Sequence, residues 1–99
     1  MRAEEVINEV ARMYGVEVED IMSSKRHREL ADCRTVICYT LCEICGLSRN
    51  EVSDIIHRRH SDVVYHIAKG KDWMEMPRLN IMGNTAILEI EFMHERESV

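Results

Sequence analysis

Between residues 28 and 45 an apolar residue recurs at every third or fourth position, which is the spacing of one face of an α-helix. A helix with this pattern has to bury its apolar side in a core. The residues that carry it are Leu30, Cys33, Ile37, Leu41 and Ile44. Gly46 follows directly, and glycine commonly ends a helix because it adopts the left-handed conformation without strain. We therefore predict a central core helix over residues 28–45.

Further helical patterns and helix-end signals predict shorter helices over residues 3–14, 19–23, 49–57 and 62–71. Gly15 is expected to end the first of them. Ser48 and Glu51 form the signature of a capping box, in which each side chain bonds the backbone amide of the other residue. Ser61 is expected to cap the last of these helices. A chain of 99 residues has room for one domain built from such elements.

The end of the chain shows a different pattern. Pro77 separates it from the helices, and two strand-like runs, 78–82 and 85–92, flank Gly83-Asn84. Glycine first in a two-residue loop suits a type II′ hairpin turn. With this turn at Gly83-Asn84, the pairing of the two strands is fixed. One face of the hairpin then holds Leu79, Ile81, Ala86, Leu88, Ile90 and Phe92.

The expected fold class is therefore mainly α, a multi-helix bundle with a short C-terminal β-hairpin. We place the helical domain at residues 1–72 and the hairpin extension at 73–99. A two-stranded hairpin is marginally stable alone, so its apolar face has to be covered. It is expected to pack on the helices of the same chain, or to pair its open edge with a second copy as a homodimer.

The net charge is −5, yet the basic residues concentrate between residues 25 and 71 while both ends of the chain are acidic. This distribution permits a local DNA-facing patch, although an ordinary mixed surface looks the same by charge alone. No apolar run is long enough to span a membrane, and the N-terminus does not have the pattern of a signal peptide. Four cysteines in such a chain indicate reduced thiols, and we expect a cytoplasmic location.

Residues 47–69 have the layout of a helix-turn-helix, in which the second helix enters the major groove with its N-terminal end. DNA recognition needs polar side chains where that helix begins. The residues there are Arg58, Arg59, His60, Ser61, Asp62 and Tyr65. An arginine can bind phosphate or read guanine with two hydrogen bonds, and a carboxylate can accept from the amino group of cytosine.

The order of these elements, with VARMYGVEVEDIMSSKRHRELADCRTVICYTLCEICGLSRNEVSDI and RRHSDVVYHIAKG, resembles the C-terminal DNA-binding domain of the bacterial replication initiator DnaA. The resemblance covers about residues 4–71. It implies a Trp-repressor-like helix-turn-helix that binds double-stranded DNA, as DnaA does at replication origins, in a bacterium or phage. His60, Ser61 and Val63 match the end of the family signature. The glycine pair of that signature is missing, Asp62 replaces a hydroxyl residue, and Asp32 stands where the family tends to be basic.

The resemblance also implies that Lys25 or Arg26, in the early basic loop, enters the minor groove and that Arg34 meets phosphate. Together with the charged residues of the turn, it predicts one DNA-facing set of side chains. The members are Lys25, Arg26, Arg28, Arg34, Arg58, Arg59, His60, Ser61, Asp62 and Tyr65. The alternative is a protein-interaction module on the same scaffold that has lost specific DNA binding.

We expect no enzymatic activity and no cofactor. The sequence holds no Gly-x-x-x-x-Gly-Lys-Ser/Thr loop, so we expect a stand-alone domain without the ATPase domain of the family.

Cys42 and Cys45, followed by His57 and His60, resemble a zinc layout with too few residues between the histidines. Because the cysteines also fall on one stripe of a helix, core packing is the favoured interpretation and no metal is expected.

Overall fold

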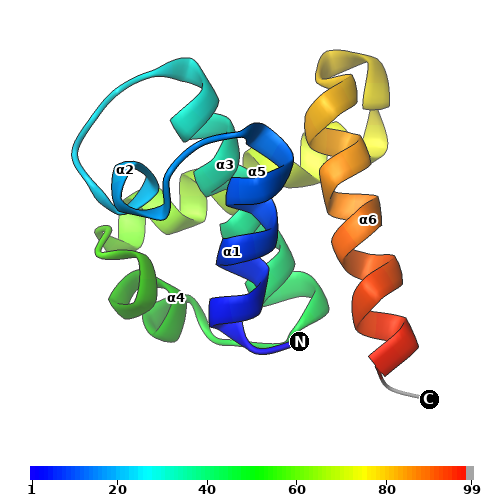
Figure 1. Cartoon of the computed structure of the whole chain (residues 1–99), viewed down its shortest axis with the longest axis horizontal. Coiled ribbons are helices and arrows are strands. Elements are labelled where there is room, and N and C mark those ends of the chain that lie inside the picture. Colours follow the sequence, from blue (N-terminus) through cyan, green and yellow to red (C-terminus); the bar gives the residue numbers. More distant parts are fainter. Residues whose placement is uncertain (98–99) are drawn as a thin grey trace.

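The computed structural model describes residues 1–97, and these residues fold into helices without any strand (Figure 1). In chain order the elements are α1 (Ala3–Tyr14), α2 (Val18–Met22), α3 (Arg28–Tyr39), the π-helical turn η1 (Thr40–Ile44), α4 (Arg49–Ile56), α5 (His60–Glu75), the 3₁₀ turn η2 (Pro77–Leu79) and α6 (Ile81–Glu97). None of the helices over residues 1–97 is long and apolar enough to cross a membrane.

The predicted core helix is confirmed as α3 and η1. Val36, Ile37 and Leu41 are fully buried at its centre. The helix widens to a π-turn at Thr40, whose hydroxyl donates to the Val36 carbonyl oxygen at 2.7 Å. Such back-bonding by threonine often bends a helix. Gly46, with a φ of 79°, then ends the segment in the left-handed conformation, as expected.

The predicted N-terminal cap is confirmed for α4 and is wrong for α5. Ser48 and Glu51 form the predicted capping box: the Glu51 amide donates to Ser48 Oγ at 3.1 Å, and the Ser48 amide donates to Glu51 Oε1 at 2.9 Å. By contrast, Ser61 is not the cap of the next helix, because α5 already begins at His60 with Arg59 as its N-cap residue. It also continues past Gly70, where a Cβ atom would lie only 2.7 Å from Tyr39 Cβ. That glycine is therefore required where α5 crosses α3, not where a helix ends.

The predicted hairpin is wrong, because residues 81–97 form α6. The backbone amide of Gly83 donates to Asn80 Oδ1 at 2.8 Å, so Asn80 caps a helix where a hairpin turn was expected. A Cβ atom at Gly83 would lie 2.4 Å from Cε3 of Trp73, which shows that this glycine is needed for close packing. Because residues 1–97 contain no strand, they offer no open edge, and the expected homodimer through a hairpin edge has no structural basis.

The buried face of α6 belongs to the same core as the other helices. Ala86, Ile87 and Ile90 are buried in it, together with Trp73 from the end of α5. The Asn84 side chain donates to the backbone oxygen of Trp73 at 3.1 Å. Residue 72, where the sequence suggested the end of the helical domain, lies inside α5.

Candidate nucleic-acid interface

The unit formed by α4, residues 57–59 and α5 is a helix-turn-helix. Val52 and Ile56 of α4 and Val63 of α5 are buried, so the two helices are held together by the core. His57 ends α4 with a φ of 56°, a left-handed conformation that glycine adopts most readily. Ser53 Oγ donates to the backbone oxygen of Arg58, and this bond closes the turn. The turn is thus fixed without the glycine that its backbone would favour.

The first turn of α5 points polar groups outward. His60, Ser61 and Tyr65 are exposed, and Asp62 is partly buried. Asp62 Oδ2 lies 3.9 Å from Arg59 Nε, which is an ion pair at the limit of contact distance. The side chain of Arg59, the N-cap residue, makes no capping hydrogen bond. The partial positive charge of the free amides therefore remains available to an anion such as phosphate.

The second part of the site is the loop between α2 and α3, residues 23–27. Lys25 forms an ion pair with Asp20, with 2.8 Å between Nζ and Oδ1. The exposed side chain of Arg26 has no hydrogen bond or ion pair with any of residues 1–97. Arg28 is exposed at the first residue of α3. Of the two loop cations Lys25 and Arg26, only Lys25 has an ion-pair partner among residues 1–97.

Arg34 is buried, with an exposed fraction of only 6%, and its guanidinium binds the end of α2 and the α2–α3 loop. Nε donates to the backbone oxygen of Ile21, Nη1 to that of Lys25, and Nη2 to those of Asp20 and Ser23, at 2.8 to 3.1 Å. Burial lowers the pKa of Arg34, and the nearby charge of Arg58 lowers it further. These four bonds use four of the five N–H donors of the guanidinium and fix the path of the loop.

Arg58 also binds this loop, since its Nη2 donates to the backbone oxygen of Ser23. The loop and the helix-turn-helix are therefore joined directly. Their side chains line one surface hollow of about 580 Å³, formed by Ser24, Arg26, Arg34, Arg58, Arg59, Asp62, Tyr65 and His66. Six of the predicted residues meet there. Lys25, His60 and Ser61 lie outside its lining, and Arg28 lines another depression together with Lys69 and Asp72.

Sequence reasoning missed His66, which lies in the wall of this hollow. It is buried, and its Nδ1 shares a hydrogen bond of 2.7 Å with Thr35 Oγ1 of α3. Burial, with a smaller effect of Arg34, lowers the pKa of His66 to about 4, so the ring is neutral at pH 7. Its edge-on contact with Tyr65, with ring centroids 5.4 Å apart, supports a residue of the exposed face. The only sequence signal was its position one helical turn after Asp62.

Lys69 is a second residue that the sequence analysis did not include. Its Nζ donates to Tyr65 Oη at 3.1 Å and lies 5.4 Å from the centroid of the tyrosine ring. This contact holds a positive charge beside the exposed Tyr65 on the surface of α5. The basic face therefore continues along the helix beyond its first turn.

The structure gives no support to a zinc site. Across residues 1–97 no group of three or more histidine, cysteine, aspartate or glutamate side chains is arranged to hold a metal ion. Cys33 and Cys38 are buried, and burial raises the pKa of each thiol to about 12. Burial likewise raises the pKa of Cys42 and Cys45. These cysteines pack as small apolar residues, and metals bind the thiolate form.

The segment of this chain that matches known proteins includes the α2–α3 loop and the helix-turn-helix. Residues 3–69 match the family model described as "Bacterial dnaA protein helix-turn-helix". The chain is 31% identical over 62 residues to the chromosomal replication initiator protein DnaA of Aquifex aeolicus (strain VF5), which covers 63% of this chain and 16% of that protein. It is 32% identical over 66 residues to the protein of the same name from Pseudothermotoga lettingae, covering 67% of this chain and 15% of the relative.

Proposed function

The chain belongs to the family of bacterial DnaA helix-turn-helix domains, and we propose that it binds double-stranded DNA through the hollow face between the α2–α3 loop and α5. The observation that carries this proposal is the meeting of Arg26, Arg58 and Arg59 with the start of α5 in one hollow. The chain spans only 16% and 15% of the two relatives. The activity of a complete initiator is therefore not carried over, and the proposed role is that of a binding domain without catalysis, acting in the cytoplasm.

In this proposal α5 enters the major groove with its N-terminal turn first. Ser61, Asp62 and Tyr65 face the bases, and His60 lies nearer the phosphates. The free amides at the start of α5 favour a phosphate oxygen. Asp62 accepts a hydrogen bond from a cytosine amino group, and Arg59, now 3.9 Å from Asp62, is released toward the backbone of the DNA.

The α2–α3 loop approaches the adjacent minor groove. Arg26 is the residue proposed to enter it, with Lys25 and Arg28 beside phosphates. Arg34 and Arg58 hold the loop by its carbonyl oxygens before any DNA is bound, so ordering the loop costs little entropy on binding. Arg34 has one N–H left for a phosphate, and its larger role in this proposal is to position the loop.

The proposed class of target is a duplex sequence of the replication-origin kind, as the family resemblance implies. The chain differs from the family signature in the turn and at Asp62, which is a proposed base-reading position. We therefore expect the preferred sequence to differ from that of the relatives. Selection from a random pool of duplexes would identify it.

A salt series on duplex DNA tests the proposal. Fluorescence anisotropy of a labelled random duplex should show affinity that falls steeply with salt, with a slope of about −0.9 per phosphate contact. Arg26→Ala and Arg59→Ala should each weaken binding and flatten that slope. Arg78→Ala is the matched control, because Arg78 is an exposed arginine in η2, outside the lining of the hollow. Absence of binding at low salt would favour the protein-interaction module instead.

A further inference from the structure

The large exposed apolar side chains of the described residues are concentrated near the end of the chain. Six of them lie between residues 76 and 92, with exposed fractions between 43% and 71%: Met76, Leu79, Ile81, Met82, Leu88 and Phe92. Surface apolar residues scattered singly are ordinary, whereas exposed apolar residues that share one face of a helix indicate an interaction surface. The segment lies beyond residue 69, where the match to the family model ends.

Four outward-facing residues of α6 form a regular stripe. Ile81, Thr85, Leu88 and Phe92 follow one another at steps of four, three and four residues. This is the spacing of the contact seam of a two-stranded coiled coil. Thr85 is the smallest of the four and the only polar one. Glu95 takes the next position and ends the apolar part of the stripe.

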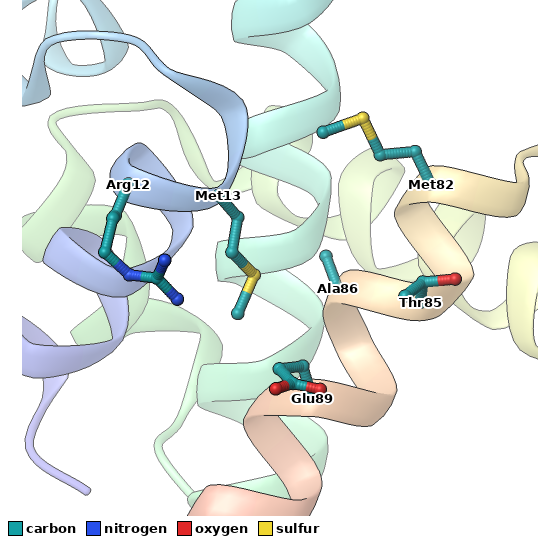
Figure 2. A pocket seen from close by; sticks show the side chains of 6 residues that line it. All are labelled: Arg12, Met13, Met82, Thr85, Ala86 and Glu89. Atoms are coloured by element: carbon teal, nitrogen blue, oxygen red, sulfur yellow. The ribbon is translucent and has the colours of Figure 1, made fainter.

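The stripe is open on the edge of the molecule. Figure 1 shows α6 along the right side of the bundle, with α1, α3 and α5 to its left and no other element further out beside its later turns. Beside the stripe, Met13 of α1 and Met82 of α6 border a shallow pocket of about 260 Å³ that has Ala86 in its lining (Figure 2). The apolar surface therefore extends from the outer face of α6 toward α1.

We propose that α6 pairs side by side with α6 of a second copy of this chain, the two helices running parallel. The charges that flank the stripe carry this choice of partner and direction. Glu91 lies on one flank and Arg96 on the other, five residues later. In a parallel pair, that spacing brings Glu91 of each copy to Arg96 of the other, which gives two ion pairs across one two-fold axis.

An antiparallel pair lacks this complementarity. Each flank then meets the same flank of the second copy. In the antiparallel register that pairs Ile81 with Phe92 of the other copy, Glu89, which shares the flank of Arg96, faces Glu89 of the other copy. The guanidinium of Arg96 lies 5.6 Å from the centroid of the Phe92 ring, which places its charge at the margin of the stripe. In the parallel pair Glu95 faces Glu95 of the second copy, so replacing this carboxylate should strengthen the pair.

The pairing surface and the proposed DNA face lie at opposite ends of the molecule. In Figure 1 the α2–α3 loop and the start of α5 are on the left, and α6 is on the right, along the longest dimension of 36 Å. A dimer through α6 directs its two DNA faces away from each other. If the proposed DNA binding holds, such a dimer would bridge two duplex segments rather than occupy adjoining half-sites.

Sedimentation equilibrium without DNA tests the pairing independently of DNA binding. Over roughly 1–200 µM the chain should pass from monomer to dimer, as a weak to moderate interface does. The double variant Leu88→Glu with Phe92→Glu should remain a monomer with unchanged helical circular dichroism. Val64→Glu is the matched control, since Val64 is an exposed apolar residue of α5, and it should still dimerise. A wild-type chain that stays monomeric over this range, or a double variant that still dimerises, would overturn the proposal.

Charge exchange tests the direction of the pair. Glu91→Arg and Arg96→Glu should each weaken the dimer about tenfold, and the two together should restore it, because the exchanged charges attract again. Failure of the double exchange to restore the dimer would overturn the parallel arrangement. Bridging of two duplexes is measured separately. In the presence of the wild-type chain, an immobilised duplex should retain a second, labelled duplex. The Leu88→Glu and Phe92→Glu double variant, a monomer that still binds one duplex, should not produce this retention.

Discussion

The side-chain amide of Asn80 donates a hydrogen bond to Asp32 Oδ2 at 3.1 Å, and this bond joins the start of α6 to α3. The other end of the same amide accepts from the backbone of Gly83 at 2.8 Å. Asn80 therefore both caps α6 and attaches it to the bundle. Asp32, which stands where the DnaA family tends to be basic, thus helps to attach the C-terminal helix α6 to the bundle.

Replacement of Asn80 should show both functions. Asn80→Ala removes the cap and the bond to Asp32, and should destabilise the chain by about 1–2 kcal/mol. Asn80→Asp keeps a capping oxygen but places a second carboxylate beside Asp32, so at neutral pH it should be less stable than Asn80→Ser. Urea unfolding of the three variants measures this. Equal stability of Asn80→Asp and Asn80→Ser would show that the Asp32 contact contributes nothing.

Gly83 provides a test of how α6 packs. Helix propensity alone predicts that Gly83→Ala stabilises a helix by up to about 1 kcal/mol. The new methyl group would lie 2.4 Å from the Trp73 ring, and overpacking of this kind costs about 1–3 kcal/mol. We therefore expect net destabilisation and a changed tryptophan fluorescence spectrum. Thr85→Ala, on the exposed side of the same helix, is the control and should change stability little. A stabilised Gly83→Ala would contradict the packing described.

The contrast between the predicted helices and the failed hairpin has a physical cause. Over residues 28–45 apolar residues recur at steps of three and four along the whole segment, so the helical period is clear and the structure follows from the sequence. In α6 both the inner residue Ile90 and the outer residues Leu88 and Phe92 are apolar. A helix that is apolar on two sides satisfies a period of two as well as a helical period, and the turn residues at Gly83 then favoured the wrong choice.

The site shows the same division between local and long-range information. The resemblance to the DnaA family predicted Lys25 or Arg26 as a DNA contact, because a basic residue in that loop is visible in the sequence itself. The burial of Arg34 depends on four carbonyl oxygens, two in α2 and two in the loop after it, and no local pattern reports this. His66 was missed because a single histidine within a helix has no distinctive signal until its bond to Thr35 is seen. Which of these residues contact DNA stays a prediction.

Variants of Arg34 and Arg26 should distinguish a residue that positions the α2–α3 loop from one that contacts DNA. A lysine at position 34 cannot make all the bonds of the guanidinium. Arg34→Lys therefore leaves carbonyl oxygens such as those of Ile21 and Lys25 without this donor, at about 1–3 kcal/mol for each one that is buried. It should therefore lower the free energy of unfolding and weaken DNA binding together. Arg26→Ala should weaken DNA binding without changing stability, because this side chain bonds to none of residues 1–97. Urea unfolding and anisotropy on the same samples check this, and an Arg34→Lys variant of wild-type stability would disprove the role in the loop.

His66 should make stability depend on pH in a defined window. Its pKa is about 4 in the folded chain and near 6.5 when unfolded, so the unfolded state binds more protons between these values. The neutral ring contributes fully to the free energy of unfolding above about pH 6.5. This contribution falls by up to about 3 kcal/mol as the pH decreases toward 4. His66→Gln should flatten this part of the profile relative to wild type. Unfolding measured at several pH values tests it, and two parallel profiles would exclude His66 as the cause.

Asp62 is the residue that should affect sequence preference most directly. A carboxylate near DNA opposes binding unless it meets a donor, so Asp62→Ala should strengthen binding to random duplex. If Asp62 accepts from a cytosine amino group, the same change should relax the preference at one base pair by about 1–3 kcal/mol. Asp62→Asn keeps the size of the side chain and removes its charge. It should share the gain in random-duplex affinity, which separates the charge effect from base reading. Site selection with the three proteins measures the preference. An identical selected sequence for Asp62→Ala and wild type would remove Asp62 from base recognition, while a gain in affinity alone would still place it near phosphate.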